Sequence, residues 1–277
     1  MGAESPDWLG ACRRSVVAIR DVLAESPTIA ERVRETGTRG SGGDRTLEID
    51  QAAEDAVFDE LSKLQCSFTA ISEERGEVDF GSRDVLVVID PIDGSLNAKR
   101  GLPQFALSVA VADGPTMADV LFGFVYDFGP GEEWVAWRGR GASLDGRPLD
   151  PTLGERRDRA GRLEILGVEQ ADPRWVVRSG DALLERAHRL RAIGSIAVSL
   201  CQVAAARMDA LASLLPCRAV DVAAGQLIVR EGGGLVSFVA CEEPLGAPLD
   251  LVPRSPVVAA RTPAALAEVA TVPSWDG

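Results

Sequence analysis

The chain has 277 residues, of which 46% are hydrophobic, and it carries a formal net charge of −13. This hydrophobic content is sufficient for a sizeable core and excludes a largely disordered chain, and the length allows one large or two modest domains. The acidic balance argues against nucleic acid as a partner, because basic surfaces bind phosphate backbones, and it favours metal cations or small substrates.

The cysteines indicate a reducing compartment. Their number is odd and no C-x-x-C pair is present, so neither a disulfide framework nor a zinc site is expected at Cys12, Cys66, Cys201, Cys217 and Cys241. The start, M-G-A-E-S-P-D-W, has no basic region and no long apolar run. We therefore expect a cytoplasmic protein with no membrane partner.

Histidine chemistry is improbable, because the chain has a single histidine, His188, within the stretch L-L-E-R-A-H-R-L-R. This stretch is predicted to be a charged helix, on whose solvated face a histidine would lie. The motif G-x-x-x-x-G-K-[ST] is absent from the sequence, which excludes a Walker-type nucleotide site.

The N-terminal part is predicted to contain two amphipathic helices. Apolar residues at three-to-four spacing predict the first from residue 7 to about Ser26-Pro27, with residues 29–33 as a continuation, and the second over residues 46–64. Between them, the glycine-rich residues 36–44 form either a flexible linker or a loop that closes over a phosphate. Asp50 lies near the start of the second helix, where a carboxylate is favourable to the helix dipole.

Two short apolar strands each end in carboxylates. Residues 67–72 end at Glu73-Glu74, and Val85–Ile89 ends at Asp90-Pro91. The turn after the second strand brings together Asp90, the Ile92 carbonyl and Asp93, and Gly94-Ser95 then opens a short helix or turn with free N–H groups. This arrangement is that of a cation bridging protein and phosphate, although Asp-Pro and Asp-Gly pairs also simply form turns.

The rest of the chain is predicted as hairpins followed by layered α/β structure. Residues 84–150 are predicted to form a mostly antiparallel sheet, with strands at 105–112, 119–126 and 133–137. A charged connector at 156–162 separates the two halves, and we place the domains at 1–150 and 151–277. For the second half we predict strands at 163–168, 175–177, 190–193, 210–214 and 234–239, and helices at 181–190, 195–208 and 223–231.

Two further features of the second half suggest chemistry. Gly194-Ser195 begins a long helix whose N-terminus is able to face an anion. Asp221 precedes a run of small and apolar residues, where its simplest role is that of a helix N-cap.

Taken together, two long motifs resemble those of the inositol monophosphatase family of lithium-sensitive, metal-dependent sugar phosphatases. The motifs are V-V-I-D-P-I-D-G-S-L-N at 87–97 and A-V-D-V-A-A-G-Q-L-I-V-R-E-G-G-G at 219–234, preceded by I-S-E-E at 71–74. Within the family the chain looks most like the archaeal branch that hydrolyses both fructose 1,6-bisphosphate and inositol 1-phosphate. The closer resemblance is carried by G-T-R-G-S-G-G-D-R-T at 37–46, S-E-E-R-G at 72–76, Ser95 and R-A-V-D at 218–221.

The resemblance implies an α+β fold, a layered αβαβα sandwich with an antiparallel sheet in the N-terminal half and a smaller α/β C-terminal half. It also implies two or three Mg²⁺ ions, with Mn²⁺ as an alternative and Li⁺ as an inhibitor, and a homodimer. The metal ligands it implies are Glu73, Asp90, the Ile92 carbonyl, Asp93 and Asp221. Asp50 and Ser95 are implied as a catalytic pair with Glu73, and Gly94 and Ser95 as residues that hold phosphate oxygens. We predict that Asp93 and, from its place at a helix N-terminus, Ser195 also bind substrate.

Arg191 and Arg218 flank two late elements, and we predict that they serve a second phosphate or sugar hydroxyls. Arg39 stands where many relatives carry Lys. At position 214, inositol-specific relatives carry a Glu that binds inositol hydroxyls, whereas this chain has Leu214. This departure weakens the case for inositol 1-phosphate as the main substrate.

The predicted reaction is hydrolysis of a phosphomonoester by in-line attack of a metal-activated water, oriented with help from Ser95 and Asp50. The sequence leaves two alternatives open: a phosphatase acting on 3′-phosphoadenosine 5′-phosphate, and a non-catalytic relative that binds metal and sugar phosphate. A haloacid-dehalogenase phosphatase is set aside, because the acids are spaced D-x-x-D and neither lysine is suitably placed.

Overall fold

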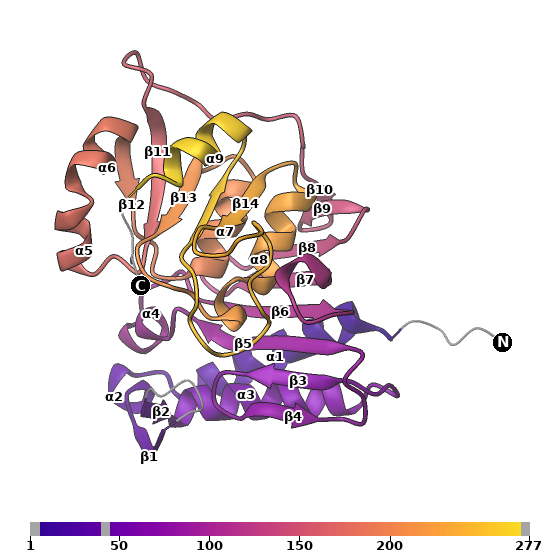
Figure 1. Cartoon of the computed structure of the whole chain (residues 1–277). Helices are drawn as coiled ribbons and strands as arrows, with labels where there is room; N and C mark the ends of the chain where they lie inside the picture. The colour runs from indigo at the N-terminus through magenta and orange to yellow at the C-terminus, as the bar shows by residue number, and fades with distance from the viewer. Residues whose placement is uncertain (1–5, 40–44, 273–277) are drawn as a thin grey trace.

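Helices and sheets alternate in five layers in the computed structural model, which describes residues 6–39 and 45–272 (Figure 1). A helical layer, an eight-stranded sheet, a second helical layer, a five-stranded sheet and a third helical layer follow one another. Most of the glycine-rich loop predicted at 36–44 lies outside the described residues. The part that is described belongs to a two-stranded ribbon of β1 (Glu35–Arg39) and β2 (Arg45–Leu47).

The first layer consists of α1 (Trp8–Glu25) and α3 (Glu48–Ser62). The apolar stripe of each helix packs on one face of the eight-stranded sheet and forms one of the hydrophobic clusters with it. The Asp7 side chain caps α1 by accepting a hydrogen bond from the Gly10 N–H. Instead of continuing α1, residues 29–32 form a separate short helix, α2 (Ile29–Arg32), which begins with a capping box of Thr28 and Glu31.

The eight-stranded sheet confirms the predicted hairpins, because β5 to β10 are sequential antiparallel neighbours. At the other end β3 pairs parallel to β5, and β4 pairs antiparallel to β3. Two parallel strands end at the same edge of a sheet, so the acids that follow β3 and β5 lie near each other. The strands are β3 (Thr69–Ser72), β4 (Gly76–Asp79), β5 (Leu86–Asp93), β6 (Ala106–Ala112), β7 (Val120–Asp127), β8 (Glu132–Trp137), β9 (Gly141–Leu144) and β10 (Arg147–Pro148). Two short helices join them, α4 (Ser95–Arg100) and the 3₁₀ turn η1 (Met117–Asp119).

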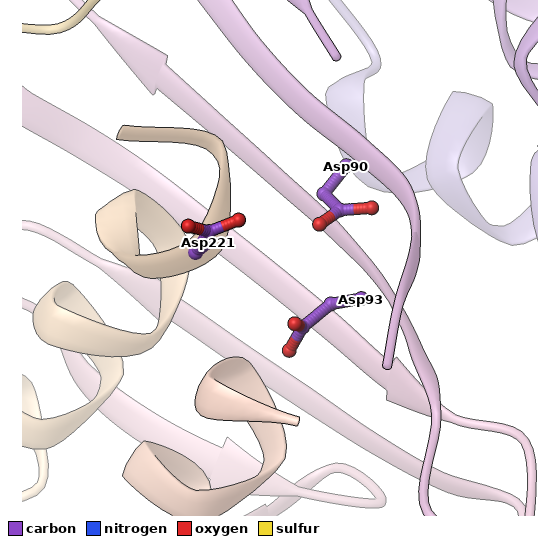
Figure 2. A group of neighbouring side chains, drawn as sticks. All are labelled: Asp90, Asp93 and Asp221. Atoms are coloured by element: carbon purple, nitrogen blue, oxygen red, sulfur yellow. The ribbon is translucent and has the colours of Figure 1, made fainter. Parts of the chain in front are cut away.

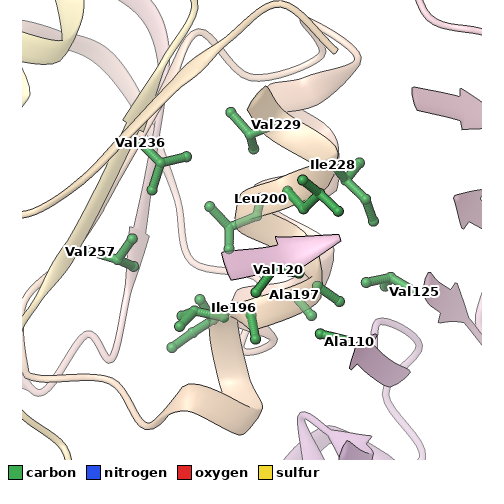
Figure 3. Packing of buried hydrophobic residues seen from close by; sticks show 14 of the residues in the cluster. Ala110, Val120, Val125, Ile196, Ala197, Leu200, Ile228, Val229, Val236 and Val257 are labelled. Atoms are coloured by element: carbon green, nitrogen blue, oxygen red, sulfur yellow. The ribbon is translucent and has the colours of Figure 1, made fainter. Parts of the chain in front are cut away.

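The middle layer consists of α7 (Ile196–Ala204) and α8 (Ala219–Glu231), which pack against both sheets. Every α8 residue from Ala219 to Val229 is buried, as expected for a helix that is apolar on all sides. Figure 3 shows side chains of both helices between valines of the two sheets. The contact with the first sheet is close: a Cβ at Gly123 of β7 would lie 2.8 Å from the Ala224 carbonyl oxygen.

The five-stranded sheet has the order β12-β11-β13-β15-β14, in which β11 is parallel to β12 and to β13. It is flanked on its outer side by α6 and α9, whose leucines, alanines and valines close a third hydrophobic cluster. Its strands are β11 (Leu163–Glu169), β12 (Ala187–Arg191), β13 (Ala210–Ser213), β14 (Leu235–Phe238) and β15 (Val257–Ala260). The outer helices are α5 (Pro173–Arg178), α6 (Gly180–Arg186) and α9 (Pro263–Val269).

Two predictions in this half are wrong. Residues 175–177 belong to helix α5, which Asp172 caps by accepting the Arg174 N–H and which has Pro173 in its first turn. The predicted helix 181–190 ends at Arg186, and His188 lies in strand β12 rather than in a helix. Strand β15 and helix α9 were not predicted.

The α+β class and the layered αβαβα arrangement are confirmed. The last strand of the first sheet ends at Pro148 and the second sheet begins at Leu163, yet one hydrophobic cluster extends through the middle helices into both sheets. The division into domains at residue 150 stays a prediction. Within residues 6–39 and 45–272, none of the helices has the length and apolar character needed to cross a membrane.

Candidate active site

Asp90 and Asp93 face the same space at the end of β5. Residues three apart on a regular strand point to opposite faces, but the pairing of β5 with β6 shifts register between Asp90 and Asp93. The Ile92 N–H donates to Asp90 Oδ1 at 3.0 Å and fixes the turn through Pro91. The two aspartates are 2% and 7% exposed.

Asp221 joins them from the first turn of α8 in the middle layer. The prediction that Asp221 is the N-cap is wrong, because α8 begins earlier and Arg218 is its N-cap; Asp221 lies at the third helical position, and its Oδ2 accepts a hydrogen bond from the Arg218 N–H at 2.9 Å. One oxygen each from Asp90, Asp93 and Asp221 lie within 4.8 Å of one another. Figure 2 shows the three carboxyl groups directed into a common space between the strand and the helix.

A small cavity of about 20 Å³ lies beside this cluster. That volume holds about one water molecule or ion. Most of the predicted catalytic and ligand residues meet here, since the lining consists of Asp50, Glu73, Glu74, Asp90, Pro91, Ile92 and Ser95.

The predicted pairing of Asp50 with the Ser95 hydroxyl is not present among residues 45–272. Asp50 Oδ1 is instead buried and has no hydrogen-bond partner. A buried carboxylate oxygen without a donor is costly, unless a cation or a water completes its surroundings.

A larger cavity of about 370 Å³ lies on the other side of the cluster. Its lining includes Asp93, Asp221 and Arg218 together with polar groups from the loop before α7. The full lining consists of Asp93, Asn97, Glu169, Gln170, Ala171, Ala192, Ile193, Gly194, Ile196, Arg218 and Asp221. Its size suits a sugar phosphate.

Gly94 lies against Gly194 and Ser195. Gly94 has φ +91°, and a Cβ there would lie 3.0 Å from the Gly194 carbonyl oxygen, so a side chain is excluded. The Ser195 hydroxyl donates to Asp93 Oδ2 at 2.5 Å, and the Ala197 N–H donates to the same oxygen at 2.7 Å. The N-terminus of α7 therefore faces an anion, as predicted, and in this structure that anion is the Asp93 carboxylate.

Burial and mutual repulsion dominate the electrostatics of the site acids, although Arg218 pairs with two of them. Burial, reinforced by Glu73 and Glu74, raises the pKa of Asp50 to about 7. Burial and the neighbouring Asp221 raise the pKa of Asp93 to about 7, and burial with Glu73 raises that of Asp90 well above its ordinary value. Carboxylate and carbonyl oxygens are the ligands that Mg²⁺ and Mn²⁺ prefer, and Asp50, whose Oδ1 has no partner, lines the small cavity beside the cluster, so the residues present fit a divalent cation.

The two arginines that are predicted to bind a second phosphate or sugar hydroxyls make other contacts in the structure, so that role stays a prediction. The Arg218 guanidinium donates to Glu73 Oε1 at 2.6 Å and to Asp221 Oδ1 at 2.9 Å, so in this structure it neutralises acids rather than standing free for a second phosphate. Arg191 lies on the edge strand β12 and donates to the Leu190 carbonyl oxygen. It lines a separate cavity of about 430 Å³, which Asp127 also lines, and not the cavity of the acid cluster.

Two supporting acids were missed from the sequence. Glu54 of α3 is fully buried, and its Oε1 accepts hydrogen bonds from the Ser72 hydroxyl and from the Glu74 and Arg75 N–H groups. Glu169 accepts hydrogen bonds from the N–H groups of Ile193 and Gly194 and from the Ser199 hydroxyl. The signal for Glu169 was its place at the end of an apolar strand; Glu54 had only its spacing of one helical turn from Asp50.

Comparison with known proteins decides the family. The family model described as the inositol monophosphatase family matches residues 10–273. The chain belongs to the inositol monophosphatase family. A fructose-1,6-bisphosphatase/inositol-1-monophosphatase of Methanothermobacter thermautotrophicus is 34% identical over 242 residues, which cover 83% of this chain and 84% of that protein. The expected resemblance to the archaeal enzymes is thereby confirmed.

Other relatives extend the comparison. The Nus factor SuhB of Escherichia coli is 38% identical over 208 residues, 73% of this chain and 74% of its own length. A solved inositol monophosphatase-fructose 1,6 bisphosphatase superposes with a TM-score of 0.79 at 25% identity, covering 96% of this chain and 99% of that one. Membership of the inositol monophosphatase family makes this chain a phosphoric monoester hydrolase of a metal-dependent type.

Proposed function

We propose that the protein hydrolyses the phosphomonoesters of sugars or polyols with Mg²⁺, with fructose 1,6-bisphosphate and inositol 1-phosphate as the first candidates. The observation that carries the proposal is the cluster of three buried aspartates, of which Asp90 lines the small cavity and Asp93 and Asp221 line the large one. The small cavity has room for an ion or a water, and the large one has room for a phosphorylated polyol.

The metal site is proposed to consist of Glu73, Asp90, the Ile92 carbonyl, Asp93 and Asp221. Bound there, divalent cations would neutralise the phosphate, make a water more acidic and stabilise the departing alkoxide. Asp50, whose Oδ1 has no partner, is proposed to accept a proton from a water in the small cavity, with the Ser95 hydroxyl orienting that water.

The phosphate is proposed to lie against Gly94, Ser95 and Ser195. The absence of a side chain at Gly94 lets the loop before α7 approach the turn where α4 begins, and the Ser195 hydroxyl is already directed at the acid cluster through Asp93. Hydroxyl groups of the substrate have Asn97 and Gln170 as candidate partners in the larger cavity.

The choice between substrates depends on what replaces the acid found in inositol-specific relatives. Leu214 is fully buried in the outer hydrophobic cluster and is not among the residues lining the larger cavity. It therefore supplies no hydroxyl-binding group, which supports fructose 1,6-bisphosphate as a substrate at least as good as inositol 1-phosphate.

The test is the release of inorganic phosphate from fructose 1,6-bisphosphate and inositol 1-phosphate in parallel, at saturating Mg²⁺, with and without Li⁺. We expect turnover of both, with fructose 1,6-bisphosphate equal or faster, and inhibition by Li⁺. Turnover of inositol 1-phosphate alone would contradict the argument from Leu214.

Release from neither substrate would direct attention to 3′-phosphoadenosine 5′-phosphate or to a binding role. One relative suggests a role other than phosphate hydrolysis, since the relative from E. coli is named as a Nus factor. Calorimetric binding of sugar phosphate and Mg²⁺ without phosphate release would favour the non-catalytic alternative. The homodimer and the cytoplasmic location stay predictions, which sedimentation and fractionation would test.

A further inference from the structure

Arg218 lies at the junction of the two cavities. Its side chain lines the larger cavity, and its guanidinium reaches Glu73, which lines the smaller one. Only 20% of the Arg218 side chain is exposed, and the Glu73 side chain is exposed to the same extent. A guanidinium in such a half-buried place is held by its acidic partners rather than by solvent.

The contacts of Arg218 occupy two carboxylates that the proposed metal site requires. One terminal nitrogen donates to Glu73 Oε1 at 2.6 Å, and the other donates to Asp221 Oδ1 at 2.9 Å. Short, charge-assisted hydrogen bonds of this kind are the stronger type. A cation that binds Glu73 and Asp221 must therefore compete with a positive charge that the chain itself supplies.

Asp221 is also held by a contact that does not involve the guanidinium. Asp221 Oδ2 accepts the backbone N–H of Arg218 at 2.9 Å, a contact that any residue at position 218 except proline would keep. A substitution of the Arg218 side chain thus removes the competing charge and leaves the acid in place on α8.

We propose that Arg218 is an internal counter-ion that holds Glu73 and Asp221 in the metal-free protein, weakens their affinity for a divalent cation, and makes that affinity rise when a phosphate anion enters the larger cavity. A phosphate offers the guanidinium an alternative acceptor inside the cavity that Arg218 already lines. Binding of metal and of phosphate is then mutually favourable, because each ligand raises the affinity of the other by the same factor. The inference rests on the proposed function and adds a regulatory contact to it.

The experiment measures Mn²⁺ binding without turnover, from the electron paramagnetic resonance signal of free Mn²⁺, with and without inorganic phosphate below its precipitation limit. The variants are Arg218→Gln, which removes the charge, and Arg218→Lys, which keeps a charge but not the forked contact. Arg83→Gln is the matched control, because Arg83 is an exposed arginine that pairs with Glu77 and lines neither cavity of the acid cluster. Thermal unfolding in a chelator shows that each variant is folded.

We expect Arg218→Gln to bind Mn²⁺ about tenfold more tightly than the wild type in the absence of phosphate, since a nearby positive charge has been removed. Phosphate should tighten Mn²⁺ binding in the wild type and much less in Arg218→Gln, with Arg218→Lys in between and Arg83→Gln unchanged. Equal or weaker Mn²⁺ binding by Arg218→Gln would overturn the inference. Absence of Mn²⁺ binding by the wild type would instead overturn the proposed metal site.

Discussion

At the scale of single residues, the proposed chemistry depends most directly on Asp93, which contributes to the acid cluster and caps α7 at the same time. Asp93→Asn should keep the second role, because an amide oxygen can still accept the Ser195 hydroxyl and the Ala197 N–H. It should lose the first role, because a neutral amide is a poor ligand for a hard cation.

We therefore expect Asp93→Asn to lower phosphate release by more than about a hundredfold, while the far-ultraviolet circular dichroism spectrum stays that of the wild type. The measurement is turnover of both candidate substrates at several Mg²⁺ concentrations. Turnover near the wild-type value in a folded variant would exclude Asp93 as a ligand.

Glu54 acts on the proposed metal site indirectly, because it holds the turn that carries Glu73 and Glu74. Glu54→Gln keeps an oxygen for the Ser72, Glu74 and Arg75 donors but loses the charge that attracts the Arg75 guanidinium at 3.4 Å. We expect Mn²⁺ affinity to fall about tenfold, as is typical when an outer partner of a ligand is altered.

The control for this prediction is Asp55→Asn, since Asp55 is an exposed neighbour that also pairs with Arg75. It should leave Mn²⁺ affinity unchanged, because exposed ion pairs contribute little. Identical affinities for Glu54→Gln and the wild type would show that the turn keeps its shape without the buried charge.

The sequence predicted the acid set because the acids follow recognisable strands and motifs, and it failed where a role depends on contacts between distant segments. Glu54 looks like any solvated acid on a helix, and nothing local indicates that a strand turn covers it. Arg218 and Glu73 are 145 positions apart, so their pairing follows only from the way α8 packs beside the edge of the first sheet.

At the scale of elements, the errors arose where local propensity and capping signals disagree. The stretch W-V-V at 175–177 is β-prone, but the Asp172-Pro173 start determines a helix. Strand β12 was partly misread as helix because its charged residues lie on an exposed sheet edge. The strands of the first sheet were predicted well, because turn residues separate clear apolar runs.

The end of β7 carries a pH-sensitive group, Asp127, which is 2% exposed. Burial raises its pKa from 3.8 to about 6, although the Gly129 N–H opposes this shift. The folded chain thus holds this proton more tightly than the unfolded chain. Raising the pH from about 4 to 6 therefore removes a stabilising contribution, which is present below pH 4 and lost above pH 6.

Asp127→Asn cannot titrate, and its amide oxygen can still accept the Gly129 N–H. The wild type should lose melting temperature relative to this variant between about pH 4 and 6, and the difference should be constant above that range. Asp172→Asn is the control, because Arg174 lowers the pKa of Asp172 to about 2 and its window lies below pH 4. Parallel melting curves for wild type and Asp127→Asn across pH 4 to 7 would contradict the prediction.

At the scale of the whole molecule, the two sheets are held together by the middle helices and by one buried arginine. Arg261, which is 4% exposed, follows β15 and donates to the carbonyl oxygens of Ala204 and Gly232, at the ends of α7 and α8. It also donates to the carbonyl oxygens of Asp150 and Leu153 in the connector between the sheets. A cation at two helix C-termini is favourable to both helix dipoles.

The layered arrangement could be predicted from the family resemblance and from the apolar character of α8, but the contacts of Arg261 could not. Arg261 lies in an unremarkable A-A-R-T-P stretch, and its partners come from three distant parts of the chain. Its contacts form only when the layers are assembled, so local sequence patterns do not predict its role.

Arg261→Met fills similar space but leaves these carbonyl oxygens without their donor. We expect the free energy of unfolding to fall by about 3 kcal/mol, since unsatisfied buried polar groups cost about 1 to 3 kcal/mol each. The melting temperature should then fall by about 5 °C for a chain of this size. Arg254→Gln is the control, because Arg254 is exposed and pairs only with Asp250 among the described residues, so its melting temperature should change little.

Because Arg261 contacts neither cavity of the acid cluster, turnover per folded molecule at 25 °C should be unchanged in Arg261→Met. If the variant unfolds like the wild type, water or the middle helices alone satisfy these carbonyl oxygens. If the variant is stable but inactive, the contacts of Arg261 position the site.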